Sequence, residues 1–386
     1  MALIGSACDG ERRASPVEEM PAGAPVSIEA EPILSVGTMQ GDTIRELYRV
    51  VTPFLHPDGR LVIPLASALT VRVFGPDGEY LTSLGQPGEG PGEFRSIDAA
   101  WLRGDTIEVY DGELLRITRF APNGGIDVVT LIGPPIQSAV PGALPDGWIL
   151  SRVTGRGEQR SAAATASGRD DIVIHHFMRD GTHAGEIART EGILRQSVPG
   201  GSGPGPLSPR AVLHVHDGLL YVGETQTPLL RVLGPDGSMR ADLHWEPDEP
   251  ASIAPAFEAV IDAAVARAPA GRSETTRLRL EAMPVPERLS VWWDFLVDPE
   301  GFVWIRPYEP LRHAAALGGL GPGSYLLGGN AQGGRWWIVS PSGVKVGEIE
   351  IPSDLSPVQI LSDALVGIRR DSLGVEYVAT FEIVRR

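Results

Sequence analysis

The chain has 386 residues and a formal net charge of −16, from 33 Lys and Arg against 49 Asp and Glu. A surface this acidic repels phosphate backbones, so no nucleic acid is expected as a partner. The 47 Gly and 34 Pro indicate many short strands joined by turns, and no apolar run reaches the roughly 18 residues of a transmembrane helix.

Residues 1–31 are predicted to be a signal remnant or a flexible tether, because most of them are Glu-, Pro- and Ala-rich without apolar periodicity. Cys8 is the only cysteine, which excludes an internal disulfide and a cysteine zinc site. It follows Met-Ala-Leu-Ile-Gly-Ser-Ala, and small residues before an early Cys resemble the end of a bacterial lipoprotein signal. Cys8 is therefore a lipidation candidate.

The same stretch lacks the basic start and the long apolar part of such a signal. The alternative to a lipid anchor is a free thiol on a frayed N-terminus. The expected location is extracytoplasmic, in the periplasm or at the cell surface, and it is cytoplasmic if Met1 is the true start.

A tight turn between two apolar strands recurs along the chain. Residues 72–78 read Arg-Val-Phe-Gly-Pro-Asp-Gly and residues 231–237 read Arg-Val-Leu-Gly-Pro-Asp-Gly, six matches in seven positions. Pro presets φ, Asp can bond its own backbone and Gly accepts φ > 0, so the segment favours a hairpin. Five such outer hairpins are predicted, with turn glycines at Gly78, Gly124, Gly181, Gly237 and Gly343.

A second series of turns interleaves with the first, and each of its turns precedes a short apolar strand. These turns begin at Asp58, Gly104, Asp146, Asp217, Glu300 and Ser362. Two hairpins per unit make a four-stranded blade, so residues 32–386 are predicted to form an all-β, six-bladed β-propeller of antiparallel blades. The last unit lacks a strand, and residues 32–36 supply one. This predicts that an N-terminal strand completes the C-terminal blade.

Long insertions interrupt the units. Residues 252–283 carry apolar side chains at helical spacing, which predicts one helical insertion between blades 4 and 5. Polar or Gly-rich loops are predicted at 154–169, 199–209 and 314–334. Turns and connectors alternate within a blade, so these insertions should gather over one mouth of the central channel. An unknown protein or small-molecule ligand is expected on that face, although the helices could instead only plug the mouth.

The connector at 85–94, which ends Gly-Glu-Gly-Pro-Gly-Glu-Phe, and the stretch 370–378 resemble bacterial six-bladed β-propeller proteins related to NHL repeats. The resemblance covers roughly residues 33–386 and implies the fold more strongly than any function. Members of that family are mostly uncharacterised, are often secreted or lipid-anchored, and share no catalytic motif. Related propellers include binding modules and a few enzymes with a metal in the central channel.

Alignment of the six inner turns places Asp98 and Asp294 on opposite blades, both facing the channel. Two carboxylates on one axis could bind a cation such as Ca²⁺. The alternative is that each accepts backbone N–H bonds at the start of its strand.

Two other groups of side chains are weaker candidates for ligand binding. His214 and His216 flank Val215, face one side of a strand in blade 4, and could form a metal cluster with Asp217, or simply meet solvent. The neighbouring Trp292 and Trp293 of blade 5 predict either packing between blades or an aromatic platform for a ligand.

The sequence thus predicts a monomeric, extracytoplasmic propeller that binds a ligand or a protein, with no cofactor and no identifiable catalytic residue. The alternative is a hydrolase or lyase centred on the channel, with Ca²⁺ held by Asp98 and Asp294.

Overall fold

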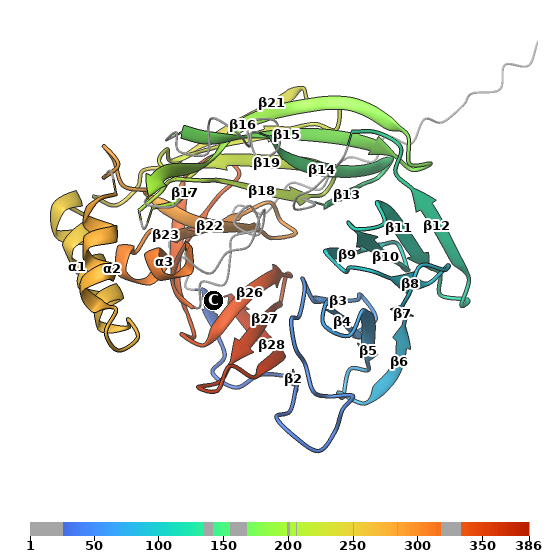
Figure 1. Cartoon of the computed structure of the whole chain (residues 1–386). Coiled ribbons are helices and arrows are strands. Elements are labelled where there is room, and N and C mark those ends of the chain that lie inside the picture. The colour runs from blue at the N-terminus through green and yellow to red at the C-terminus, as the bar shows by residue number, and fades with distance from the viewer. Residues whose placement is uncertain are drawn as a thin grey trace, which may run out of the picture.

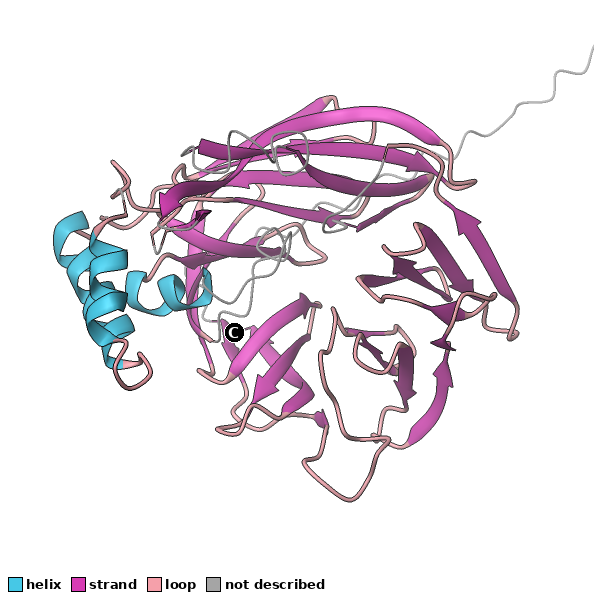
Figure 2. Cartoon of the chain, viewed as in Figure 1, coloured by secondary structure: helices cyan, strands magenta, loops and turns pink. Residues whose placement is uncertain are grey.

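The computed structural model describes residues 26–134, 142–154, 168–198, 201–205, 207–249, 251–283, 285–317 and 333–385. Six antiparallel sheets stand around one axis as the blades of a β-propeller, which confirms the predicted fold class (Figure 1). The helices of the described ranges gather at one side of the ring (Figure 2). None of them combines the length and apolar character that a membrane span requires.

Each blade runs from an inner strand beside the axis to an outer strand at the rim. Blade 1 contains β3 (Phe54–Leu55), β4 (Leu61–Leu65), β5 (Thr70–Phe74) and β6 (Tyr80–Leu84). Blade 2 contains β9 (Ala99–Arg103), β10 (Thr106–Asp111), β11 (Arg116–Phe120) and β12 (Ile126–Thr130). In the connector between these blades, β7 (Gln86–Pro87) and β8 (Glu93–Phe94) pair in parallel.

The next two blades follow the same order. Blade 3 contains β13 (Gly142–Leu144), β14 (Gly147–Thr154), β15 (Gly168–Met178), β16 (His183–Val198) and β17 (Gly201–Pro204). Blade 4 contains β18 (Ala211–His216), β19 (Leu219–Glu224), β20 (Leu229–Leu233) and β21 (Met239–His244). The fifth strand of blade 3 lies where the sequence predicted only a loop at 199–209, because β16 is long enough for its end to pair with β17.

The last two blades bring the chain back to its start. Blade 5 contains β22 (Trp292–Val297), β23 (Val303–Pro307), β24 (Gly334–Val339) and β25 (Lys345–Ile351). Blade 6 contains β26 (Leu355–Ile360), β27 (Ala364–Arg370) and β28 (Glu376–Arg385), joined by β1 (Val26–Ile28) and β2 (Leu34–Val36).

The N-terminal strands close the ring, as predicted for residues 32–36. Leu34–Val36 pairs with residues 378–380 of β28. Further along the same strand, Val26–Ile28 pairs with residues 383–385. Residues 26–31 therefore belong to the folded ring and not to the tether predicted at 1–31, because the far half of β28 offers them unpaired backbone groups. The rest of that segment, with Cys8, lies outside the described residues.

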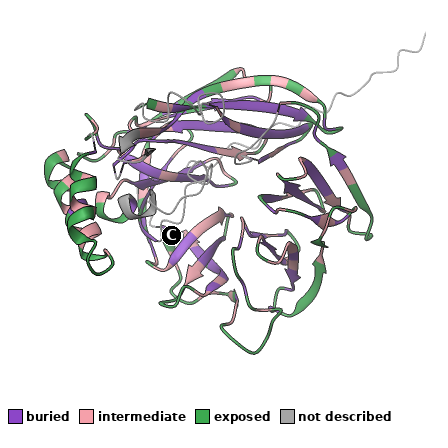
Figure 3. Cartoon of the chain, viewed as in Figure 1, coloured by how far each residue is buried: buried purple, intermediate pink, exposed green. Residues whose placement is uncertain are grey.

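The middle strands carry the core. All five residues of β4 and of β23 are buried, whereas outer strands such as β6 are mostly exposed (Figure 3). Both faces of a middle strand are covered because each blade packs against a neighbour on either side. The largest fully buried side chains include five of the tryptophans of blade 5 and one of blade 3, namely Trp292, Trp293, Trp304, Trp336, Trp337 and Trp148.

Hydrogen bonds to buried carboxylates link neighbouring blades within this core. Glu108 of blade 2 is fully buried, accepts two hydrogen bonds from Arg103 at 2.9 and 3.0 Å, and accepts a third from Trp148 Nε1 of blade 3 at 2.8 Å. In the same way, Asp298 of blade 5 accepts a hydrogen bond from Arg385 of blade 6 at 3.1 Å. A buried carboxylate with several donors is stable in the core, so these hydrogen bonds hold the blades in place relative to one another.

The helical insertion between blades 4 and 5 contains α1 (Ile253–Ala266) and α2 (Ser273–Glu281). A third helix, α3 (Pro310–Leu317), lies between β23 and β24, where the sequence predicted only a loop, and it packs against α1. Its local pattern is short: Pro310 suits a first helical turn, but Ala- and Gly-rich sequence follows. Both insertions leave the ends of strands on the same face of the ring, as predicted from the alternation of turns.

Removal of the closing strands is expected to destabilise the ring in steps. Deletion of residues 1–25 spares β1 and β2 and should leave the melting temperature unchanged. Deletion of residues 1–31 removes β1, and deletion of residues 1–40 removes both strands and exposes the edge of β28. Calorimetry should therefore rank the three variants in that order of decreasing melting temperature. Equal values for the shortest and longest deletions would contradict closure by these strands.

The outer-turn glycines allow a matched test of the repeat. Gly124 and Gly237 both have positive φ, +82° and +76°. An added Cβ at Gly124 meets nothing within 4 Å, whereas at Gly237 it would lie 2.4 Å from the Ile187 carbonyl oxygen of blade 3. Gly124→Ala should cost about 1 kcal/mol for the backbone conformation alone. Chemical denaturation should show a clearly larger loss for Gly237→Ala, and equal losses would refute the close approach of blades 3 and 4 at this turn.

Candidate functional site

A cluster of buried polar side chains lies between blades 4 and 5, at the strand ends that face the long insertions. Arg210 directly precedes β18, Trp293 and Asp294 belong to β22, and Arg306 belongs to β23. We call these residues, together with Tyr308 and His313, the blade 4–5 cluster.

A β-bulge positions the two tryptophans of β22 differently. Trp292 is paired with Pro307 and Asp294 with Arg306, so Trp293 has no partner across the ladder. Trp292 packs in the core between blades 4 and 5 and donates its Nε1 hydrogen to the Thr227 carbonyl at 2.7 Å. Trp293 instead packs with side chains of blades 3 and 4 and contacts the cluster.

Trp293 is the centre of the cluster. The Arg210 guanidinium carbon lies 4.1 Å from the centroid of its ring, a cation–π contact. The His313 ring stacks on the same indole with centroids 4.5 Å apart and planes 6° apart. The Tyr308 ring lies 6.1 Å from Trp293 and 5.5 Å from His313. Trp293 is 1% exposed and His313 is 0% exposed, whereas Tyr308 is half-buried.

A hydrogen bond to Nδ1 of His313 determines which ring nitrogen carries the hydrogen. The backbone N–H of Glu309 donates to His313 Nδ1 at 2.9 Å, so this side chain caps the start of α3. Burial, with Arg306 and Arg210 nearby, holds the pKa of His313 well below its usual range, and the ring is neutral. Since Nδ1 accepts, the hydrogen sits on Nε2, which has become a donor.

Three donors of the cluster have no acceptor among the described residues. The Trp293 Nε1–H, the Tyr308 hydroxyl and His313 Nε2 are all buried and unpartnered. Each such group loses hydrogen bonds to water on folding and costs roughly 1–3 kcal/mol if nothing replaces them. Buried polar groups without a hydrogen-bond partner are rare in native proteins, so three of them in one stack need a physical explanation.

Asp294 is the carboxylate of the cluster. Burial raises its pKa to about 6, although Arg210, the backbone N–H of Phe295 and Arg306 all favour the charged form. Burial in turn lowers the pKa of Arg210 and of Arg306 to about 10. Both arginines are at most 1% exposed and remain charged at neutral pH. The side chain of Arg210 also donates to the Trp293 carbonyl, which holds the guanidinium against the stack.

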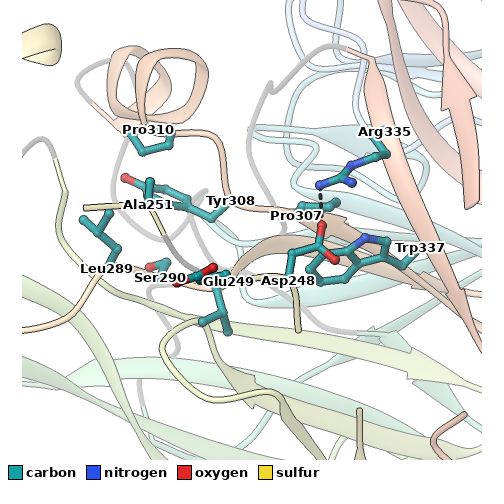
Figure 4. Close-up of a pocket in the computed structure, with 11 residues that line it drawn as sticks. Asp248, Glu249, Ala251, Leu289, Ser290, Pro307, Tyr308, Pro310, Arg335 and Trp337 are labelled. Atoms are coloured by element: carbon teal, nitrogen blue, oxygen red, sulfur yellow. Dashed lines mark hydrogen bonds and ion pairs between the residues drawn. The ribbon is translucent and has the colours of Figure 1, made fainter. Parts of the chain in front are cut away.

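A pocket of about 150 Å³ adjoins the cluster and shares Tyr308 with it. The ion pair of Asp248 with Arg335, at 2.6 Å, lies at one end, and Leu289 and Ser290 lie at the other (Figure 4). Ser290 Oγ lies 2.8 Å from Thr225 Oγ1, which in turn accepts from the Arg210 backbone N–H at 3.1 Å. The pocket and the cluster are thus two parts of one continuous region beneath α1 and α3.

The predicted pair Asp98 and Asp294 falls into two different settings. Asp98 is exposed and accepts from Ser96 Oγ at 2.6 Å and from the Gly112 backbone N–H at 2.8 Å. The second of these is a backbone N–H bond, the kind that the alternative interpretation expected. Asp294 is half-buried beside Arg210.

The histidine candidates of β18 do not belong to the cluster. The His214 ring lies 6.0 Å from Phe295, edge to face, and burial with the neighbouring His216 lowers its pKa to about 4. Burial also lowers the pKa of His216, against the opposing effect of Asp217, Asp298 and Glu300. Across the described residues, no three His, Cys, Asp or Glu side chains lie close enough together to hold a metal ion.

Sequence reasoning missed Arg210, Arg306, Tyr308 and His313. Arg306 gave a signal, because it follows three apolar residues in a strand that reads Val-Trp-Ile-Arg-Pro and is expected to be buried throughout. His313 gave none, since the sequence did not predict the helix in which it lies.

No family model and no curated protein matches the chain. Solved structures match it along almost its full length. A member of the DUF4221 family from Bacteroides vulgatus is 12% identical, with a TM-score of 0.53, and the match covers 95% of this chain and 100% of that one. A "Putative exported protein" from Bacteroides fragilis is 9% identical, with a TM-score of 0.51, and the match covers 95% and 97%.

Virginiamycin B lyase from Staphylococcus aureus is 10% identical, with a TM-score of 0.43, over 93% of this chain and 100% of that one. The chain is thus a six-bladed β-propeller whose structural neighbours include bacterial proteins of the same architecture. At these identities the likeness concerns the fold alone.

The lowered pKa of His214 predicts acid sensitivity of the fold. In the unfolded chain the His214 imidazole takes up a proton near its ordinary pKa of 6.5. In the folded protein the same ring stays neutral until the pH falls to about 4. The stability that the neutral ring contributes is therefore lost as pH falls from about 6.5 towards 4. In urea denaturation at pH 7 and at pH 4.5, His214→Gln should lose less unfolding free energy on acidification than the wild type.

His244 is exposed and provides the matched control. His244→Gln should show the same loss on acidification as the wild type. If His214→Gln also shows that loss, the His214 imidazole is not the source of the acid sensitivity.

Proposed function

We propose that this protein is a ligand-binding β-propeller and that its ligand contacts the blade 4–5 cluster and the adjoining pocket. The observation that carries the proposal is the set of three buried, unpartnered donors in one aromatic stack, on Trp293, Tyr308 and His313. A fold that keeps such groups together at this cost is explained by a ligand that supplies the missing acceptors.

The position of the cluster supports the same proposal. Its residues come from strand ends on the face that carries α1, α2 and α3, and the pocket lies beside them. Loops and insertions on a rigid scaffold are where binding residues concentrate. The opposite face carries the short outer turns around Gly78, Gly124 and Gly343.

We further propose that the chain is related to the NHL-repeat propellers and works outside the cytoplasm, with Cys8 as a lipid attachment point. The resemblance of the connector at 85–94 and the small residues before Cys8 support this part of the proposal.

Binding is tested by thermal shift with a panel of small carboxylates, phosphates, sugars and amines, each at the same concentration and ionic strength. At least one class should raise the melting temperature of the wild type, because a ligand that binds only the folded state stabilises it. The shift should be lost in His313→Phe, which removes the Nε2 donor. A separate pair of samples with CaCl₂ and with EDTA tests the Ca²⁺-dependent enzyme, for which a metal-dependent shift is required.

The control is Asn123→Ala, at an outer turn on the opposite face. It should keep the ligand-induced shift of the wild type. Loss of the shift in Asn123→Ala but not in His313→Phe would place the ligand on the wrong face for this proposal.

A further inference from the structure

We propose that the blade 4–5 cluster recognises an oxyanion on the ligand, either a carboxylate or a tetrahedral phosphate or sulfate group. The inference rests on the proposed binding function and specifies the chemistry that the site accepts.

The first argument is the kind of hydrogen bond that the cluster offers. An indole N–H is a donor only, and the neutral His313 ring offers only its Nε2 hydrogen, because Nδ1 already accepts from Glu309. The Tyr308 hydroxyl is the third unpartnered group, and burial raises its pKa, so it stays protonated and able to donate. Such a set is complementary to a group that only accepts, and ionised oxygens are the strongest acceptors.

The second argument is the association of these donors. Single unpartnered donors occur elsewhere in the described core, for example on Tyr110 and Trp336. Only in the blade 4–5 cluster do ring contacts join three of them, as far as the described residues show. An isolated group is explained by packing, but three in contact form a binding surface.

The third argument is charge. The guanidinium groups of Arg210 and Arg306 are both buried near Asp294. Of the carboxylates, Asp294 has the largest favourable electrostatic effect on each of them. Glu309 also acts on Arg306, but it pairs with Arg312 at 3.4 Å. The two guanidinium groups place positive charge beside the three donors, which favours an anion there.

Asp294 then acts as a competitor for the ligand. The charged Asp294 carboxylate attracts the guanidinium groups of Arg210 and Arg306. When Asp294 is protonated, this attraction is lost and both guanidinium groups can interact more strongly with the oxyanion. The other charged or titratable groups that face it or its partners are Tyr308 on blade 5 and Glu309, Arg312 and His313 at α3. Because burial raises the pKa of Asp294 to about 6, anion binding should tighten as pH falls through that value.

The probes are sodium acetate for a carboxylate and sodium sulfate for a tetrahedral oxyanion, which keeps its charge from pH 5 to pH 8. Glycerol and ethanolammonium chloride are the neutral and cationic probes. Affinity is measured by titration calorimetry and by thermal shift at constant ionic strength. The wild type should bind acetate or sulfate more tightly than the other two probes, and the preferred anion identifies the class.

Donor deletions test whether the anion occupies the cluster. Tyr308→Phe and Trp293→Phe each remove one hydrogen-bond donor and should weaken anion binding about tenfold, the value of one bond to a charged group. His313→Phe should weaken it similarly, whereas His313→Gln keeps an acceptor and a donor and should retain most of the affinity. Tyr110→Phe and Trp336→Phe are matched controls, since each removes an unpartnered donor outside the cluster and should bind like the wild type.

The pH dependence provides a second readout. Sulfate affinity of the wild type should rise between pH 7.5 and pH 5, and Asp294→Asn should bind tightly and almost equally at both values. A flat wild-type profile together with unchanged binding in Asp294→Asn would overturn the competition.

The outcomes separate the inference from the function on which it rests. If glycerol or ethanolammonium binds and is lost in Tyr308→Phe while the anions do not bind, the site binds a ligand but the oxyanion is refuted. If no probe shows binding that depends on Tyr308, Trp293 or His313, both the inference and the proposed function are refuted. If the matched controls lose anion binding as strongly as the cluster variants, the anion binds elsewhere and the inference is refuted.

Discussion

Backbone pairing along β28 is the constraint on which the rest of the ring depends. One edge of this strand pairs with β27, and the other pairs with β2 near its start and with β1 near its end. An open array of blades would leave unpaired strand edges and uncovered apolar faces, so the closing strands stabilise every blade interface indirectly. The blade 4–5 cluster depends on this closure too, since residues of two blades must hold their positions to within a fraction of an ångström.

The same geometry explains why the insertions and the cluster share a face. Within a blade, connectors to the next blade and loops between the second and third strands leave from the same ends of the strands. The insertion with α1 and α2 is of the first kind, and α3 belongs to the second. Both therefore meet over the start of β22 and the end of β23. There His313 of α3 stacks on Trp293, and Val260 of α1 packs in one apolar cluster with Leu289 and Tyr308.

The repeat could be predicted from sequence because its signal is local. Gly78 and Gly237 have the positive φ that a Pro-Asp-Gly turn requires. Each of these short sequences specifies a hairpin through local interactions alone. The cluster could not be predicted in this way. Arg210 and His313 are brought together by the closure of two blades and by a helix that the local sequence does not indicate. Strand alignment found Asp294 but paired it with Asp98, which accepts hydrogen bonds from Ser96 and Gly112 within blade 2.

A comparison between two blade interfaces separates structural polar groups from those that await a partner. Between blades 2 and 3, Trp148 contacts Arg103 and Arg119, and its Nε1 hydrogen goes to the buried Glu108, which also accepts two hydrogen bonds from Arg103 and lies 3.4 Å from Arg119 Nε. Between blades 4 and 5, Arg210 lies against Trp293 beside Asp294, but the indole hydrogen has no acceptor in the described parts of the chain. At blade 2–3 the fold therefore supplies the acceptor of the indole N–H from its own residues. The acceptor absent at blade 4–5 is the position that a ligand oxygen would fill.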